Sequence, residues 1–197
     1  MTAIAGNATR LLDIRPGLGQ TVRVTTQRNI VLVGFMGTGK STVGLILARR
    51  RAFSFVDMDT LIVEREGKPI PRIFAEDGEP HFRSAERALV RELAAGSGMA
   101  IATGGGIVLN PDNIADFSRT GLVVCLWADA DAILRRVGSD TNRPLLHCDD
   151  KLGRIRELMA KRAPLYDTIP ARVDTTGLAP AAVAERILAI YDGQTFN

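Results

Sequence analysis

The segment GFMGTGKS at residues 34–41 constrains the fold of this chain more than any other feature. It follows a short apolar run at 30–33 and leads into an amphipathic stretch at 41–50, so the sequence predicts a strand, a glycine-rich turn and a helix in succession. In that arrangement backbone N–H groups surround phosphate oxygens, a lysine reaches the β- and γ-phosphates, and a serine hydroxyl binds Mg²⁺. A chance glycine-rich turn is the alternative. The strand and helix on either side favour a phosphate-binding loop.

Short apolar runs alternate with amphipathic stretches along the rest of the chain, which is the pattern of a parallel sheet with helices on both faces. The sequence therefore predicts an α/β fold with a five-stranded parallel sheet. Further strands are expected at 54–56, 99–102, 122–127 and 172–173, and further helices at 84–94, 130–137, 151–162 and from Pro180 onward. Residues 64–82 and 138–150 break the alternation, and irregular segments of that length usually serve as lids or binding loops.

The charge distribution separates a basic N-terminal segment from a neutral remainder. The 197-residue chain has 25 basic and 22 acidic residues, and residues 1–28 hold four of the arginines and one aspartate, which accounts for the whole net charge of +3. Residues 29–197 are therefore balanced and lack the basic excess of a nucleic-acid-binding domain. Residues 1–28 also lack a periodic apolar face, so we expect a disordered extension ahead of one domain at 29–197.

The predicted location of the protein follows from its apolar runs and its cysteines. No apolar run approaches the roughly 20 residues of a membrane-spanning helix, and Cys125 and Cys148 do not form a Cys-x-x-Cys pair. These features favour a cytoplasmic protein that needs neither disulfides nor structural zinc. The arginines of residues 1–28 would also suit an organelle transit peptide, although this segment contains no serine.

Two aspartates follow the second predicted strand. Asp57 and Asp59 are two residues apart, so both carboxylates should project from the carboxyl edge of the sheet, where ligands bind in open α/β folds. One could serve a metal ion through water, and the other could bind a substrate hydroxyl. Two solvated loop residues, or an N-cap for a helix from Thr60 onward, would give the same pattern.

Arginines supply further candidate groups. Arg83 and Glu86 are three residues apart in a predicted helix, so Glu86 can orient the Arg83 guanidinium toward a carboxylate, although spacing alone favours an ordinary surface ion pair. Arg143 precedes a proline, which restrains it to extended geometry and could aim it at phosphates when the loop closes. Arg162 is near the end of a predicted helix, where a positive charge is favourable without any ligand.

Three glycines follow the third predicted strand, in the segment TGGG at 103–106. Glycines at the carboxyl end of a strand let a ligand approach the main chain closely. A flexible turn is the alternative.

Six motifs, taken in order, resemble those of the shikimate kinase family. They are GFMGTGKST at 34–42, FVDMD at 55–59, FRSAE at 82–86, TGGG at 103–106, RPLL at 143–146 and RAPLY at 162–166. The resemblance covers residues 29–193 and implies a P-loop NTPase fold of the nucleoside-monophosphate-kinase kind, with strand order 2-3-1-4-5. It further implies a substrate-binding segment at 58–95, a lid at 138–150, and transfer of the γ-phosphoryl group of ATP to the 3-hydroxyl of shikimate, on the route to chorismate and the aromatic amino acids.

The resemblance also implies a role for each motif residue. Lys40 and Ser41 would hold phosphate and Mg²⁺, and Asp57 would support the metal through water. Asp59 would bind the substrate hydroxyls and act as the candidate base, and the shikimate carboxylate would lie between Arg83, braced by Glu86, and Arg162. The implied nucleotide contacts are Gly37, Thr38, Gly39, Lys40, Ser41, Thr42, Arg136 at the adenine, and Arg143 from the lid. The implied substrate contacts are Asp59, Arg83, Gly104, Gly105, Gly106 and Arg162, and the implied catalytic residues are Lys40, Asp59 and Arg143.

Two other functions are compatible with parts of this pattern. A P-loop kinase for another small hydroxy acid, such as gluconate, would also need a carboxylate clamp, but gluconate kinases lack the paired FRSAE and TGGG motifs seen here. A catalytically silent family member would bind nucleotide and serve a partner protein, but every expected catalytic position is occupied. We expect a monomer that binds ATP, Mg²⁺ and shikimate, with no nucleic-acid or membrane partner.

Overall fold

The computed structural model describes residues 27–138 and 148–193. Within them, five parallel strands form one sheet in the order β2-β3-β1-β4-β5, which confirms the predicted fold class and strand order. Central β1 pairs with β3 on one side and β4 on the other, with Val31 opposite both Ile101 and Val123. The strands are β1 (Asn29–Gly34), β2 (Ser54–Asp57), β3 (Met99–Ala102), β4 (Gly121–Trp127) and β5 (Ala171–Asp174).

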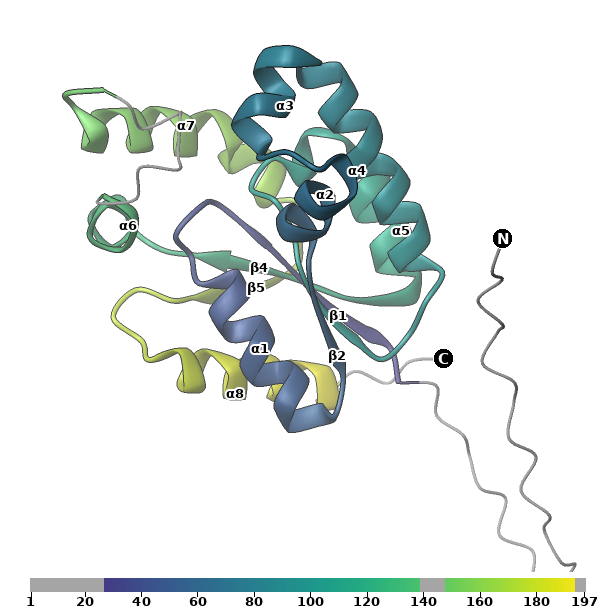
Figure 1. Ribbon diagram of the computed structural model, residues 1–197. Helices are drawn as coiled ribbons and strands as arrows, with labels where there is room; N and C mark the ends of the chain where they lie inside the picture. The colour runs from purple at the N-terminus through teal and green to yellow at the C-terminus, as the bar shows by residue number, and fades with distance from the viewer. Residues whose placement is uncertain (1–26, 139–147, 194–197) are drawn as a thin grey trace, which may run out of the picture.

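Helices cover both faces of this sheet (Figure 1). Helices α1 (Lys40–Arg51) and α8 (Pro180–Gly193) pack on one face and contact each other. The opposite face carries α2 (Met58–Glu66), α3 (Ile70–Glu76), α4 (Glu79–Ala94), α5 (Pro111–Thr120), α6 (Ala130–Val137), α7 (Lys151–Tyr166) and the short 3₁₀ helix η1 (Ile107–Leu109).

The strand periodicity creates a separate core on each face of the sheet. Side chains alternate along a strand, so Ile30 and Leu32 face α1 and α8, while Val31 and Val33 face the other helices. All four are fully buried. Burial on both faces explains why β1 is apolar without a polar alternation.

Residues 64–82 are mostly helical, so the expectation of an irregular segment is wrong. Their prolines and glycines lie at helix ends: Gly67, with φ 67°, ends α2, Pro69 caps α3, and Gly78 precedes α4, which has Pro80 in its first turn. These are the positions where glycine and proline are tolerated or preferred. As a result α4 starts at Glu79, ahead of the predicted residue 84.

One further helix was not predicted, and another ends later than predicted. Helix α5 was not expected, although Asn110 caps it by accepting from the Asp112 N–H at 3.0 Å and Pro111 occupies its first turn. Helix α7 continues past residue 162 to Tyr166 and contains Pro164. Of the expected lid, Gly138 and residues 148–150 are described. None of the described helices is both long and apolar enough to cross a membrane.

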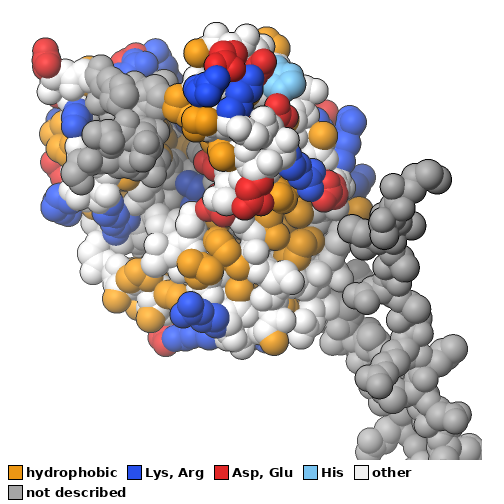
Figure 2. Space-filling model, viewed as in Figure 1, with side chains coloured by type: hydrophobic (Ala, Val, Ile, Leu, Met, Phe, Trp, Pro, Cys, Tyr) orange, Lys and Arg blue, Asp and Glu red, His pale blue; other side chains and the backbone are white. Residues whose placement is uncertain are grey.

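Charges of both signs are mixed on the surface of α2, α3 and α4. Lys68 and Arg72 both pair with Glu76, and the ring Nε2 of His81 lies 2.8 Å from a carboxylate oxygen of Glu66. Figure 2 shows these helices as neighbouring blue and red side chains at the top of the molecule. Exposed pairs of this kind contribute little to stability individually. On this face the mixture agrees with the balanced charge of residues 29–197.

Candidate active site

The segment between β1 and α1 forms a loop at the N-terminus of α1. Gly37 and Gly39 have φ values of 75° and 95°, in the left-handed region that favours glycine. Lys40 Nζ donates to the carbonyl oxygens of Gly34, at 2.8 Å, and Phe35, at 2.9 Å. The lysine ammonium therefore lies against the loop, where the helix N-terminus also favours an anion.

A cavity of about 470 Å³ opens over this loop. Its walls come from the loop itself, the carboxyl ends of β2, β3 and β5, and α6. Every nucleotide contact expected from the sequence and described by the structure lines it, namely Gly37, Thr38, Gly39, Lys40, Ser41, Thr42 and Arg136. Arg143 lies outside the described residues.

Ser41 and Asp57 connect the start of α1 to the end of β2. Ser41 Oγ donates to Asp57 Oδ2 at 2.6 Å. Asp57 Oδ1 accepts from the backbone N–H groups of Asp59 and Thr60, so Asp57 is also the N-cap that the sequence offered as an alternative. Mg²⁺ binds few protein oxygens and keeps its other positions for water and substrate phosphates. A hydroxyl and a carboxylate beside a phosphate-binding loop fit that ion.

The glycine segment after β3 makes room for neighbouring side chains. A Cβ on Gly104 would lie 2.6 Å from Asp59 Oδ1, and a Cβ on Gly106 would lie 2.7 Å from both terminal nitrogens of Arg83. The sequence predicted that a ligand could approach the main chain closely at these glycines. In the structure, the Asp59 carboxylate and the Arg83 guanidinium lie close to the main chain at Gly104 and Gly106. A Cβ on Gly105, by contrast, would meet no neighbouring atom closer than 3.5 Å.

Arg83 is held by two carboxylates. Its Nη1 donates to Glu86 Oε2 at 2.9 Å, and its Nε and Nη2 donate to Glu79 Oε1 at 3.1 and 3.0 Å. Glu86 is only 2% exposed, so the interpretation as a surface ion pair is wrong. Burial raises the pKa of Glu86, although the nearby Arg83 charge opposes the shift. Sequence reasoning missed Glu79 because it placed the start of the helix too late.

Arg162 approaches the same glycine segment from α7. Its Nη1 donates to the carbonyl oxygen of Gly105 at 3.0 Å, and its guanidinium carbon lies 6.0 Å from the centre of the Phe35 ring. Since α7 continues to Tyr166, Arg162 is not the terminal charge of a helix. The Tyr166 hydroxyl donates to the same carbonyl at 2.6 Å. The motif RAPLY contained this tyrosine, but the predicted helix ended at residue 162 and so did not place Tyr166 on the same helix as Arg162.

Arg136 bridges α6 and the phosphate-binding loop. Its Nη1 donates to the Gly37 carbonyl at 3.1 Å and to Thr175 Oγ1 at 3.0 Å, and its Nη2 donates to the Thr175 carbonyl at 2.7 Å. Thr175 was not a candidate, although its position directly after β5 is the signal that could have identified it.

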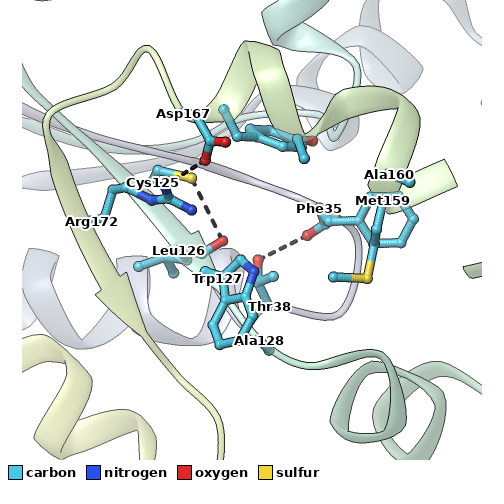
Figure 3. A pocket seen from close by; sticks show the side chains of 12 residues that line it. Phe35, Thr38, Cys125, Leu126, Trp127, Ala128, Met159, Ala160, Asp167 and Arg172 are labelled. Carbon is cyan, nitrogen blue, oxygen red and sulfur yellow. Dashed lines mark hydrogen bonds and ion pairs between the residues drawn. The ribbon is translucent and has the colours of Figure 1, made fainter. Parts of the chain in front are cut away.

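A second cavity, of about 290 Å³, shares Thr38 with the first. Figure 3 shows Phe35 and Thr38 on one side of it and the ion-paired Asp167 and Arg172 near Cys125 on another. Thr38 Oγ1 donates to the Phe35 carbonyl at 2.8 Å. Burial raises the pKa of Cys125 to about 11, so its thiol stays protonated near neutral pH. This thiol therefore does not have the character of a nucleophile.

Comparisons with known proteins identify the family of this chain. The sequence model of the family described as shikimate kinase matches residues 36–192. A shikimate kinase from Thermodesulfovibrio yellowstonii is 42% identical over 165 residues, which make up 84% of this chain and 95% of that protein.

The solved structures give the same result. Shikimate kinase from Acinetobacter baumannii, solved in complex with shikimate, aligns with a TM-score of 0.82 and 35% identity over 87% of this chain and 97% of that one. A gluconokinase from Sinorhizobium meliloti aligns with a TM-score of 0.55 and 17% identity over 85% of this chain and 93% of that one, which is a likeness of fold alone. The family model matches most of the chain, and the alignments cover nearly the full length of the related shikimate kinases. This chain therefore belongs to the shikimate kinase family.

Proposed function

We propose that this protein transfers the γ-phosphoryl group of ATP to the 3-hydroxyl of shikimate. The observation that best supports this substrate is the position of Arg83 and Arg162, which reach the glycine segment at 104–106 from two different helices. Two guanidinium groups beside a phosphate-binding loop suit a small acceptor that carries a carboxylate. The charge balance of residues 29–197 makes such placed arginines more significant than a general basic surface.

Each end of the acceptor would meet a different part of the site. The carboxylate of shikimate binds between Arg83 and Arg162, and Glu86 and Glu79 hold Arg83 in a fixed orientation. The hydroxyl groups face Asp59, which lies over Gly104 on the side of the glycine segment that borders the phosphate-binding cavity. Holding both ends fixes the reacting oxygen, and positioning supplies much of the rate in phosphoryl transfer.

The proposed chemistry needs one base and several positive groups. Asp59 accepts the proton of the 3-hydroxyl group while the oxygen of that hydroxyl forms a bond to the γ-phosphorus of ATP. The bond between the γ-phosphorus and the β–γ bridging oxygen breaks, and ADP leaves. Lys40 exchanges its loop carbonyls for phosphate oxygens, and the backbone N–H groups at the start of α1 bind the β-phosphate. Arg136 lies where it can contact the nucleotide base.

Ser41 and Asp57 would hold Mg²⁺, the serine directly and the aspartate through water. The ion supplies charge neutralisation for the transferring phosphate oxygens. Asp57→Asn tests this assignment, because asparagine still caps α2 but carries no charge. The Mg²⁺ concentration for half-maximal rate should rise in this variant. It should stay unchanged in Asp112→Asn, a control in the exposed first turn of α5.

The function is tested by measuring ADP release with Mg-ATP and shikimate, gluconate or quinate in parallel. We expect ADP release to depend on shikimate and to stay near background with gluconate. Equal turnover of shikimate and gluconate would favour a kinase of broader or different specificity. Binding of ATP without turnover of any of the three acceptors would favour a catalytically silent protein.

Three further assignments belong to this proposal. We place the protein in the cytoplasm, where ATP and a reducing environment suit a kinase with two free cysteines. We also propose that it acts as a monomer. Residues 58–95 would serve as the substrate-binding segment, since they carry Asp59, Arg83 and Glu86.

A further inference from the structure

One backbone carbonyl receives two hydrogen bonds from α7. The Gly105 oxygen accepts from Arg162 Nη1 at 3.0 Å and from Tyr166 Oη at 2.6 Å. The two donors are four residues apart, so they lie on the same face of the helix. A carbonyl oxygen has two lone pairs, and these two bonds can use both.

The Tyr166 side chain is well placed to fix this carbonyl. Its residue is 6% exposed, and a buried tyrosine hydroxyl normally has a hydrogen-bond partner. Burial raises its pKa to about 12, so the hydroxyl remains a donor throughout the pH range of a cytoplasmic enzyme. Tyr166 also lines the second cavity, where packing around the ring is incomplete. The bond to Gly105 is therefore an important constraint on the orientation of this ring.

Gly105 is the centre of the proposed acceptor site. Its neighbour Gly104 lies against Asp59, and its neighbour Gly106 lies against Arg83. A shift of the Gly105 carbonyl would move the anchor of Arg162 directly and would disturb the surfaces against which Asp59 and Arg83 lie. Fixing this one carbonyl therefore helps to set the relative positions of all three side chains.

We infer that Tyr166 is a positioning residue for the acceptor: its hydroxyl holds the Gly105 carbonyl and thereby sets the direction in which Arg162 presents its remaining donors to a carboxylate. The inference rests on the proposed function, because it takes shikimate as the acceptor. Tyr166 does not touch the reacting atoms. Its effect should appear in acceptor binding and only weakly in the chemical step.

The sequence contains a matched control, because it has two tyrosines. The hydroxyl of Tyr191, on α8, also donates to a backbone carbonyl, that of Arg28, at 2.8 Å. Helix α8 packs on the opposite face of the sheet from α7. Tyr166→Phe and Tyr191→Phe each remove one hydroxyl-to-carbonyl bond, so a general loss of stability should affect both.

Steady-state kinetics on both variants, each assayed below its melting temperature, distinguish positioning from stability. Tyr166→Phe should raise the KM for shikimate by about 3- to 10-fold, the effect of losing one hydrogen bond, and leave kcat and the KM for ATP within about twofold of the unmodified protein. Tyr191→Phe should leave all three constants unchanged. The increase in shikimate KM caused by Tyr166→Phe should also be smaller in an Arg162→Lys background, because the effects of substitutions are not additive when one residue acts through the other.

Each other outcome contradicts a particular claim. An unchanged shikimate KM in Tyr166→Phe, or an equal increase in both tyrosine variants, would overturn the positioning role while the proposed function stands. A full effect of Tyr166→Phe in the Arg162→Lys background would show that Tyr166 does not act through Arg162. Failure of the unmodified protein to phosphorylate shikimate would overturn the proposed function and this inference together.

Discussion

Arg83 Nη1 and Glu86 Oε2 lie 2.9 Å apart, and the Glu86 carboxylate is almost completely buried behind the guanidinium. A buried ion pair contributes little net stability, because removing both charges from water costs about as much as their attraction returns. The benefit here is orientation, since the carboxylate fixes one edge of the guanidinium. Burial raises the pKa of Glu86, and the charges of Asp59 and Glu79 add to that shift, while Arg83 opposes it.

Glu86→Gln should change how stability depends on pH. A carboxyl group whose pKa is higher in the folded than in the unfolded protein favours folding below the unfolded pKa, about 4.3 for glutamate. That contribution is lost as pH rises through the higher folded pKa. The free energy of unfolding of the unmodified protein, relative to that of Glu86→Gln, should therefore fall between pH 4 and neutrality. Urea unfolding of both proteins at several pH values measures this difference.

Glu92→Gln is the matched control, because Glu92 also lies on α4 and pairs with Arg65, but at the surface. The hydrogen bond with Arg65 lowers the pKa of Glu92. Its contribution to stability is therefore present above the usual glutamate pKa and is lost as pH falls. The two variants should show pH trends of opposite sign. The same trend in both would mean that burial does not control the ionisation of Glu86.

Gly106→Ala should impair acceptor binding more than folding. The backbone of Gly106, at φ −97°, is accessible to alanine, but the new Cβ would lie 2.7 Å from the terminal nitrogens of Arg83. The guanidinium is the end of a flexible side chain and can move away, so the melting temperature should change little. The shikimate KM should rise about 10-fold or more, since hydrogen bonds to charged groups are worth about 1.5–3 kcal/mol. Gly193→Ala, which has open space around it, serves as the control. An unchanged KM would mean that Arg83 does not bind the acceptor.

The strands were predictable because burial on both faces leaves a strong signal in the sequence. The runs around Val31, Ile101 and Val123 are almost wholly apolar, and their predicted ends fall within one residue of the observed ones. The helices of residues 58–82 were not predicted, because only very short links separate them, and Gly67 and Gly78 lie in these links at the ends of helices. Local sequence alone does not distinguish a glycine that ends a helix from one in a loop.

The candidate site was predictable in its membership but not in its internal contacts. The positions of Asp57 and Arg83 follow from strand ends and helix spacing. That Glu86 is buried, and that Asp59 lies against Gly104, depends on how α2 and α4 pack above β3, which spacing along the chain does not encode. The roles of Glu79 and Tyr166 depend on helices that extend beyond the predicted ranges of 84–94 and 151–162.

Asp59→Asn should separate the proposed base from the binding groups. Asparagine keeps the size of the side chain and its contact with Gly104 but does not accept a proton at neutral pH. We expect kcat to fall by about 10²-fold or more, the range for loss of a general base, while ATP binding stays close to normal. Rapid-quench measurement of the first turnover would show whether the chemical step is slowed. Full activity in a folded Asp59→Asn protein would exclude the assigned role.

The N-terminal boundary of the domain gives the last prediction. Gln27 accepts a hydrogen bond from the Gly98 N–H at 2.7 Å, and Arg28 donates to the Arg119 carbonyl at 2.9 Å. The buried side chain of Asn29 bonds to the backbone of Leu93, Gly96 and Met99.

A chain that begins at residue 27 retains all of these contacts, and residues 1–26 have no periodic apolar face. Such a chain should therefore keep its melting temperature within a few degrees and its kcat/KM nearly unchanged. A chain that begins at residue 30 loses several hydrogen bonds worth about 1 kcal/mol each, and should melt about 10 °C lower. Calorimetric melting of the two truncated chains beside the full one tests both expectations. A large fall in melting temperature for the chain that begins at residue 27 would show that residues 1–26 contribute to the stability of the domain. An unchanged melting temperature for the chain that begins at residue 30 would show that the hydrogen bonds of Asn29 do not contribute to it.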